Sequence, residues 1–291
     1  MLKRLSLLFV VLLLIVGSVA AQDMAAIDCK GSEGSTLSVM ASWAGEEEET
    51  FRTIVGPLLD ACSITLNYEG TRDMNTVLPT RVEGGAPPDI AVFANPGALK
   101  TFAANLIPLT ELGVNADNYS ESWQALGSVA GAWLGLPVKT DIKSLVWYSP
   151  VAFEASNYEV PATWDELVAL MDQMVADGGP APLAMGFESG GATGWTATDF
   201  VQDVLLRTQG ADFVAGLTTG ETAWNDPAVI EAWTLYADWA NKYGAGGADG
   251  AITTSFGDAI LQPFLDPAEA WMVKQSGFAG SATIQPNFPD Y

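Results

Sequence analysis

The sequence predicts an α/β fold of two lobes, with a polar segment that crosses from one lobe to the other. Residues 36–93 alternate strand and helix patterns in the order βαβαβ, which is typical of a parallel sheet with helices on its faces. A second α/β-patterned half begins at Pro150. Between the halves, residues 135–150 place a cluster of Lys, Thr, Asp and Lys inside an apolar strand pattern. Because charges within a strand are costly without a cleft or a partner, we expect a strand that crosses between the lobes at a polar ligand site.

The first half contains the clearest strand and helix patterns. The predicted strands are residues 36–41, 63–68 and 89–93, and the predicted helices between them are residues 46–59 and 73–82. Asn95 and Pro96 then form a good helix start, with Asn as the cap and Pro at the first helical position. This half should form a parallel sheet that is covered by helices on its faces.

The second half repeats the alternation with longer helices. Thr163 and Glu166 form a capping box, which predicts a helix that runs to about Ala176. The other predicted elements are helices at residues 150–158, 198–208 and 227–242, a strand at residues 183–187, and an apolar segment at residues 268–273. The glycine-rich residues 244–250 are expected to be a flexible connection. We find no internal repeat.

The N-terminus has the three parts of a secretory signal. Lys3 and Arg4 supply the positive region, residues 7–16 the apolar region, and residues 18–21 a small-residue cleavage site. The apolar run is short for a membrane span, which needs about 20 residues, so an uncleaved anchor is the weaker alternative. We therefore expect residues 1–21 to be removed and the protein to be exported, either to the periplasm or to the extracellular space.

The composition excludes several classes of function. The formal net charge of −23 argues against nucleic-acid partners and anionic lipid. The chain has no histidine, which excludes histidine-based triads and histidine-ligated zinc and leaves carboxylates, Lys or Tyr as acid–base groups. We predict no metal site and no cofactor. The hydrophobic fraction of 49% excludes a disordered chain.

The chain has two cysteines, Cys29 and Cys62. Each lies just before a predicted parallel strand, so both should lie at the same end of the sheet. A disulfide suits an exported protein, and we expect these two residues to be bonded, with two free thiols as the alternative.

Candidate ligand residues follow the three strands of the first half, because open α/β folds bind ligands at the carboxyl ends of their strands. Trp43 and a run of four glutamates follow the first strand. The helix dipole accounts for most of that run, and we expect Glu47 to face a ligand as well. Arg72 and Asp73 follow the second strand, where a turn and a cap explain Asp73 but not Arg72. Asn95 follows the third strand, where its role as a helix cap is sufficient by itself.

Further candidates come from the crossing segment and the second half. In the crossing segment, Asp141 either binds a ligand or pairs with the neighbouring Lys139 and Lys143. A plain glycine-rich loop equally explains residues 188–195, whose glycines would let backbone approach a ligand. The candidates are Lys139, Asp141 and Lys143 in the crossing segment, Glu188, Thr193 and Trp195 in the loop, and Trp271 and Lys274 in the last apolar segment.

Aromatic faces combined with planar polar groups are typical of sites for neutral sugars. The C–H face of a pyranose stacks on an indole, and its hydroxyls form bidentate hydrogen bonds with Asp, Glu, Arg and Asn. These residue types favour a sugar ligand. Most of the 10 tryptophans are assigned to the core or to helix faces, and Trp164, Trp233 and Trp239 have helical spacing.

The chain resembles the family 1 extracellular solute-binding proteins of ABC importers, the maltose-binding-protein-like group, and within it the alpha-glucoside and oligosaccharide binders. The resemblance covers the chain from Gly34 onward. The matching segments are Trp43 with the acidic helix start, and residues 68–73, 87–90, 139–148, 160–167 and 188–195. Members of this family continue well past the equivalent of Tyr291, so the resemblance implies that the chain is truncated at its C-terminus.

The resemblance implies a two-lobed periplasmic-binding-protein fold of class II type, in which each lobe is a mostly parallel sheet flanked by helices. The expected division is a signal at residues 1–21, a linker at residues 22–35, and two incomplete lobes at residues 36–140 and 141–291. The implied function is capture of a sugar without turnover, by a monomer that delivers it to the permease subunits of an ABC importer. The alternative is a secreted glycoside hydrolase, which needs a carboxylate pair about 5–10 Å apart. Glu188 is one candidate for that pair, with no evident partner.

Overall fold

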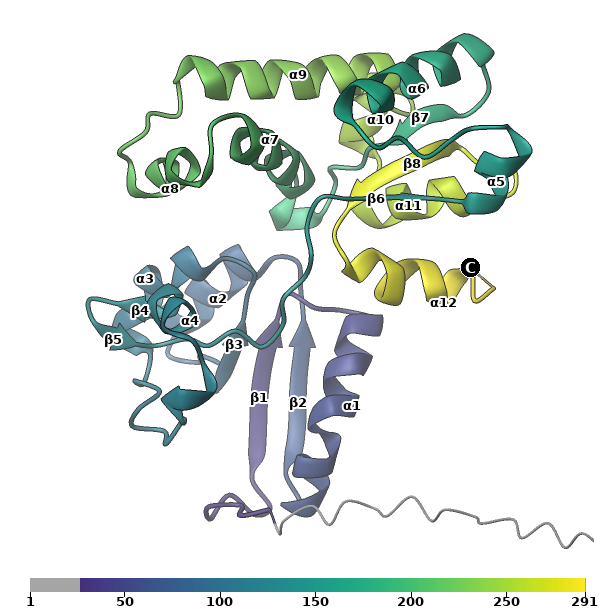
Figure 1. The fold of residues 1–291 in the computed structure, drawn as a ribbon. Coiled ribbons are helices and arrows are strands. Elements are labelled where there is room, and N and C mark those ends of the chain that lie inside the picture. The colour runs from purple at the N-terminus through teal and green to yellow at the C-terminus, as the bar shows by residue number, and fades with distance from the viewer. Residues whose placement is uncertain (1–26, 291) are drawn as a thin grey trace, which may run out of the picture.

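A three-stranded parallel sheet forms the centre of the first lobe. The computed structural model describes residues 27–290, and in it β1 (Thr36–Ala41) lies between β2 (Thr65–Gly70) and β3 (Ile90–Val92) (Figure 1). The predicted parallel strands are confirmed, although β2 begins later and β3 is shorter than predicted. The predicted signal at residues 1–21 and the first part of the predicted linker, residues 22–26, lie outside the described residues.

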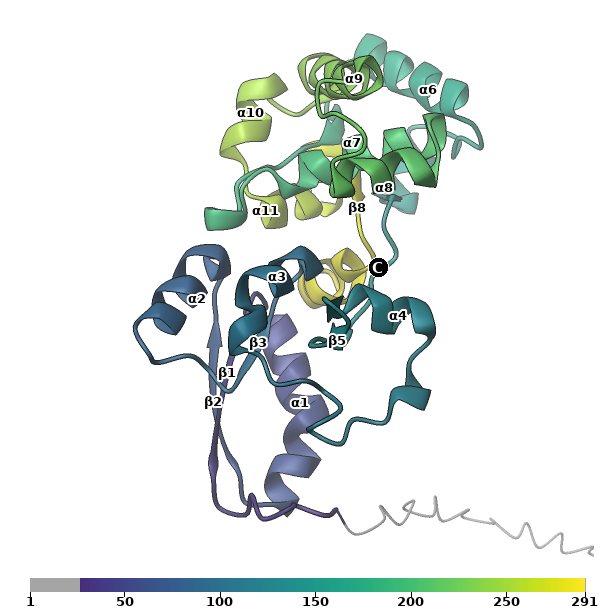
Figure 2. The ribbon, with the colours of Figure 1, turned by 90° about the vertical axis from the view of Figure 1, so that its left-hand side faces the viewer.

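Helices cover both faces of this sheet. Figure 2 shows α1 (Glu46–Ala61) and α2 (Met74–Glu83) on opposite sides of the strands. The strand order β2-β1-β3 requires this arrangement, because the chain moves outward from β1 to β2 and then back to β3, and right-handed connections in opposite directions lie on opposite faces. Met40 of β1 packs with Met74 and Leu78 of α2 in the core of this lobe.

Short elements complete the first lobe. The side chain of Asn95 accepts a hydrogen bond from the backbone N–H of Gly97, as the predicted helix start requires, but only a single 3-10 turn and one short helix follow. These elements are η1 (Pro96–Ala98), α3 (Leu99–Phe102), η2 (Ala103–Asn105), η3 (Ala116–Asn118), α4 (Glu121–Leu126), and the antiparallel pair β4 (Ser128–Val129) and β5 (Ala132–Trp133).

The second lobe is built on a mixed sheet with the strand order β6-β8-β7. In it β7 (Ala181–Ala184) is parallel to β8 (Ala270–Gln275), whereas β6 (Leu145–Tyr148) is antiparallel to β8. The core above this sheet contains fully buried Met171 and Met174 of α6 and Leu205 of α7. The helices are α5 (Pro150–Ala155), α6 (Trp164–Asp177), α7 (Trp195–Thr208), α8 (Ala211–Thr219), α9 (Pro227–Tyr243), α10 (Gly247–Thr253) and α11 (Phe256–Leu261), with the 3-10 turns η4 (Gly190–Ala192) and η5 (Gln262–Phe264).

The predicted capping box of α6 is confirmed: the side chain of Thr163 accepts from the N–H of Glu166, and that of Glu166 accepts from the N–H of Thr163. Two other predictions are wrong. Residues 244–250 are not a flexible connection, because Gly246 adopts a left-handed conformation (φ +70°) that starts α10. The strand predicted at residues 183–187 ends at Ala184, because Phe187 N–H donates to the carbonyl of Ala251 instead of continuing the sheet.

The segment that joins the lobes is extended but is not a strand. Residues 134–144 have no ladder partner, Pro137 has no N–H to donate, and β6 begins only at Leu145. The predicted strand through the polar cluster is therefore wrong. A single backbone bond, from Gly277 N to Ile142 O at 2.8 Å, ties this segment to the chain that leaves β8. That chain continues through a π-helical turn (Ala279–Ile284) into α12 (Gln285–Asn287), and the turn contacts both α11 and α1.

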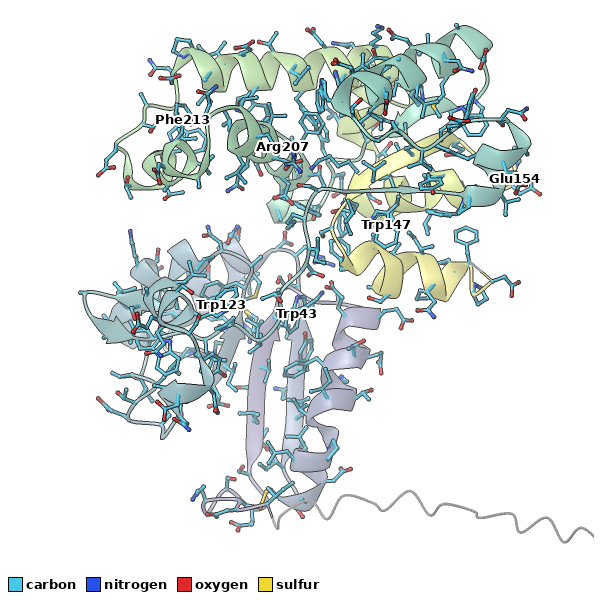
Figure 3. The ribbon with its side chains drawn as sticks, viewed as in Figure 1. Trp43, Trp123, Trp147, Glu154, Arg207 and Phe213 are labelled. Atoms are coloured by element: carbon cyan, nitrogen blue, oxygen red, sulfur yellow. A yellow bond between two sulfur atoms is a disulfide. The ribbon has the colours of Figure 1, made fainter. Side chains whose placement is uncertain are left out.

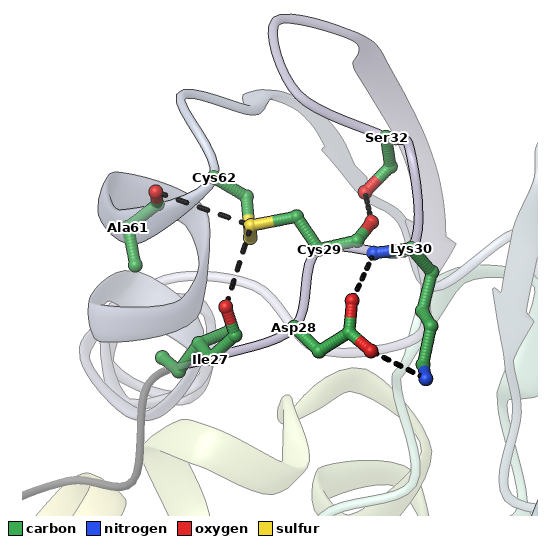
Figure 4. Close-up of a disulfide and its surroundings, with 7 residues drawn as sticks. All are labelled: Ile27, Asp28, Cys29, Lys30, Ser32, Ala61 and Cys62. Atoms are coloured by element: carbon green, nitrogen blue, oxygen red, sulfur yellow. Dashed lines mark hydrogen bonds and ion pairs between the residues drawn. A yellow bond between two sulfur atoms is a disulfide. The ribbon is translucent and has the colours of Figure 1, made fainter.

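A disulfide ties the start of the described chain to the end of α1. Figure 4 shows Cys29 bonded to Cys62, with their Cα atoms 5.6 Å apart. Both cysteines lie at the amino end of the sheet, β1 beginning at Thr36 and β2 at Thr65, as their positions in the sequence predict. Among residues 27–290, no helix has the length and apolarity that crossing a membrane requires.

Candidate functional site

The candidate site lies where the carboxyl ends of β1 and β2 face the second lobe. Figure 3 shows Trp43 at the end of β1 that points toward that lobe. Trp43 and the first turn of α1 follow β1 directly, and Arg72 and Asp73 follow β2. The carboxyl ends of parallel strands meet at one edge of a sheet, which explains why residues about 30 positions apart in the chain converge here.

Glu47 is the centre of an ion-pair cluster. One of its carboxylate oxygens accepts from Lys139 Nζ at 2.9 Å, and the other accepts from Arg72 Nη2 at 3.1 Å. Lys139 also pairs with Asp141, at 3.3 Å. Burial lowers the pKa of Lys139, but the hydrogen bond and charge of Glu47, together with Asp141, outweigh burial and hold that pKa above its ordinary value. Lys139 is therefore charged at neutral pH.

Each of these two cations also lies against an aromatic ring of the second lobe. Lys139 Nζ is 5.8 Å from the ring centroid of Trp43 and 5.6 Å from that of Phe278. The guanidinium carbon of Arg72 is 5.2 Å from the centroid of Phe256. Cations at such distances from a ring face are attracted by its quadrupole, so the contacts with Phe278 and Phe256 join the two lobes.

A direct hydrogen bond also joins the lobes. The side chain of Asp73 accepts from the backbone N–H of Gly191 at 2.7 Å. A Cβ atom on Gly191 would lie 2.8 Å from Asp73 Oδ1, which is too close for a stable contact. The glycine-rich loop between β7 and α7 therefore allows the backbone of the second lobe to approach a carboxylate of the first.

Trp195 begins α7 in an aromatic and cationic environment. Its ring lies 5.3 Å from Phe256 and 6.2 Å from Phe278, and Lys143 Nζ is 5.0 Å from its centroid. Lys143 in turn pairs with Asp199, one turn further along α7, at 2.6 Å. The contacts form a continuous row of aromatic and cationic groups from Trp43 through Lys139 and Phe278 to Trp195.

Lys274 lines a neighbouring cavity of about 40 Å³ at the carboxyl end of β8. This volume is room for a few water molecules and not for a sugar ring. Lys274 pairs with Asp203 at 3.3 Å, and Asp203 also pairs with Arg207. Burial lowers the pKa of Lys274 to about 8, against the opposing attraction of Asp199.

This lowered pKa predicts a pH dependence of stability. The ordinary Lys pKa is 10.5, so between pH 8 and 10.5 the unfolded chain binds more protons than the folded chain, and the contribution of Lys274 to stability rises with pH. Chemical denaturation of the parent and of Lys274→Met should show the parent gaining about 1–2 kcal/mol relative to the variant from pH 7 to 10, with solvent screening allowed for. Lys100→Met, at an exposed lysine, is the control. A difference that does not change with pH would contradict the prediction.

The remaining predicted residues lie apart from this row or act within their own loop. Thr193 braces its loop, because its hydroxyl donates to the carbonyl of Gly190 and accepts from the N–H of Ser189. Glu188 accepts from the N–H of Gly190 at 2.8 Å and is otherwise exposed. Asn95 is exposed and serves as a helix cap.

Trp271 lies at the opposite end of β8 from Lys274, edge-on to Tyr158 at 5.0 Å, and its Nε1 is buried. The structure therefore gives Trp271 a place in the core of the second lobe and not in the site.

Three residues of the site were not predicted from the sequence. Phe256 and Phe278 receive cations from the first lobe, and Asp199 pairs with Lys143. Each of the two phenylalanines stands alone among small and polar residues, without a local signal. Asp199 lies four residues after Trp195, a spacing that puts both residues on the same face of a helix. This spacing could have identified Asp199 from the sequence.

Comparison with known proteins shows the family to which the chain belongs. The model of the family described as bacterial extracellular solute-binding protein matches residues 44–275. The chain belongs to this family. The two-lobed α/β architecture agrees with that membership.

Two curated relatives are each 35% identical to the chain. One is the osmoprotective compounds-binding protein GgtB of Synechocystis sp., matched over 83% of this chain and 59% of its own length. The other is the alpha-glucosides-binding periplasmic protein AglE of Rhizobium meliloti, matched over 86% of this chain and 57% of its own length. The chain thus spans less than two thirds of the length of these relatives.

Solved structures show the same fold. A solute-binding protein of an ABC transporter from Thermotoga lettingae, bound with alpha-D-tagatose, superposes with a TM-score of 0.68 at 21% sequence identity. The match covers 88% of this chain and 65% of that one. At this level of identity, the likeness establishes the fold alone.

Proposed function

We propose that the chain captures a neutral sugar, an alpha-glucoside or an oligosaccharide, between its two lobes outside the cytoplasmic membrane, and delivers it to the permease subunits of an ABC importer. The observation that carries this proposal is the row of aromatic and charged groups from Trp43 in the first lobe to Trp195 in the second. The name of one relative, the alpha-glucosides-binding periplasmic protein AglE, supports a sugar ligand.

The residues proposed to contact the sugar are grouped by their chemistry. The two indoles offer stacking faces for pyranose C–H groups. Carboxylates accept from hydroxyls and cations donate to them, in charge-assisted hydrogen bonds. The proposed set is Trp43, Arg72, Asp73, Asn95, Lys139, Asp141, Lys143, Glu188 and Trp195, with Thr193 shaping the loop and Lys274 at the neighbouring cavity.

The charges around this row favour an uncharged ligand. Arg72, Lys139 and Lys143 each have a carboxylate within 3.3 Å. An anionic ligand would have to displace one of those carboxylates, in a protein whose net charge is −23. The glycoside hydrolase alternative has no support from the family or from the relatives.

The proposal predicts binding without turnover. Isothermal titration of the purified chain with maltose, trehalose and sucrose should give saturable binding of at least one sugar, and chromatography of the mixture should recover that sugar intact. Absence of measurable binding across a broad panel of mono- and oligosaccharides would refute the sugar assignment. Release of reducing sugar that Glu188→Gln abolishes would favour the hydrolase instead.

A further inference from the structure

Glu47 occupies an unusual place among the four glutamates that begin α1. Its side chain is 13% exposed, and each of its two oxygens accepts from a different cation. By contrast, Glu48 pairs with Arg52 of the same helix, and Glu49 is exposed. The helix dipole favours all four glutamates equally, so it does not explain the position of Glu47.

The two cations that Glu47 holds come from separate parts of the chain. Arg72 belongs to the loop between β2 and α2, and Lys139 belongs to the segment that joins the lobes. Both cations lie within about 3 Å of one carboxylate, so they would repel each other if its charge were removed. Glu47 therefore fastens the joining segment to the first lobe.

The same two cations are the ones that contact the second lobe. Arg72 lies against Phe256 and Lys139 against Phe278. Phe256 and Phe278 pack on each other and on the buried cluster of Ile260 and Ala279, so they are fixed parts of the second lobe. A change in the position of either cation thus changes a contact between the lobes.

We propose that Glu47 is a positioning residue, which does not contact the solute but directs Arg72 and Lys139 toward Phe256 and Phe278 and so sets the separation of the two lobes before a solute arrives. The separation of the lobes in turn determines how much of the binding free energy is needed for closure. Only this consequence for affinity rests on the proposed function.

The test compares Glu47→Gln with Glu49→Gln. Both variants lose one negative charge from the same helix turn, but only the first loses an ion pair. Nitroxide labels at Glu83→Cys in α2 and Asp212→Cys in α8, both exposed, report the distance between the lobes in the oxidised protein. Without solute, Glu47→Gln should give a longer and broader distance distribution, and Glu49→Gln should match the parent. Lys139→Met removes the same pair from its other side and should shift the distribution in the same direction.

Titration with the sugar found for the parent completes the test. Glu47→Gln should raise the dissociation constant of that sugar about tenfold, because lobes that lie further apart need more of the binding free energy for closure. Glu49→Gln should leave the dissociation constant unchanged. The proposal is overturned if Glu47→Gln keeps the parent distances. Parent distances with lost affinity would make Glu47 a direct sugar ligand, and parent distances with unchanged affinity would leave it without a role in binding. If the parent binds no sugar, the proposed function fails, and the distance measurement still decides the role of Glu47.

Discussion

Replacing Trp195 with alanine is expected to raise the dissociation constant for the bound sugar about tenfold or more, because a stacked aromatic contact contributes about 1–3 kcal/mol. The indole begins α7 and lies beside Phe256, Phe278 and Lys143, at the end of the row that starts at Trp43. Trp195→Phe should retain part of the affinity, because a flat face remains. Titration calorimetry of the three proteins gives the comparison.

Trp224→Ala is the matched control for this prediction. Trp224 belongs to the same lobe, but it is 64% exposed and lies in the loop before α9. Its removal should change neither the affinity nor the melting temperature. If Trp195→Ala binds normally and melts early, Trp195 is a packing residue and the assignment of the site is wrong.

Loss of the bond between Cys29 and Cys62 is expected to lower the free energy of unfolding by about 3–4 kcal/mol. The two residues are separated by 33 positions, and a closed loop of this size restricts the unfolded chain to that extent in the chain-entropy model. Chemical denaturation with and without reductant measures the change.

A Cys29→Ala/Cys62→Ala variant separates the bond from other effects of the reductant. The variant should unfold at the midpoint of the reduced parent, and reductant should not change that midpoint further. Two titratable thiols in protein that is denatured without reductant would show that the bond is absent and would contradict the prediction.

Local patterns were sufficient to predict most elements of the fold. The strand at residues 36–41 and the helices that begin after Thr163 and at Pro227 agree with the structure to within about a residue, because strand alternation, capping and proline signals act over a few neighbouring positions. The errors have non-local causes. β7 ends early because Phe187 bonds to Ala251, and β6 begins only at Leu145, where it meets β8, a strand more than a hundred residues later.

The candidate site shows the same division. Trp43, Arg72, Lys139 and Trp195 were predicted from their positions after strands or in the joining segment, and the structure brings them into one row. Phe256 and Phe278 could not be predicted, because an isolated phenylalanine has the same local pattern whether it packs in a core or contacts a cation. Trp271 was assigned to the site for the opposite reason: polar neighbours in sequence concealed its packing against Tyr158.

The proposed function requires that a sugar bind between the two lobes, with contacts to both. A crystal structure of the protein grown with the sugar that binds best in the titration panel tests this claim directly. We expect density for the sugar in contact with Trp43 of the first lobe and Trp195 of the second. Density for the sugar on the outer surface of a single lobe, with Trp43 and Trp195 both free of contact, would contradict it.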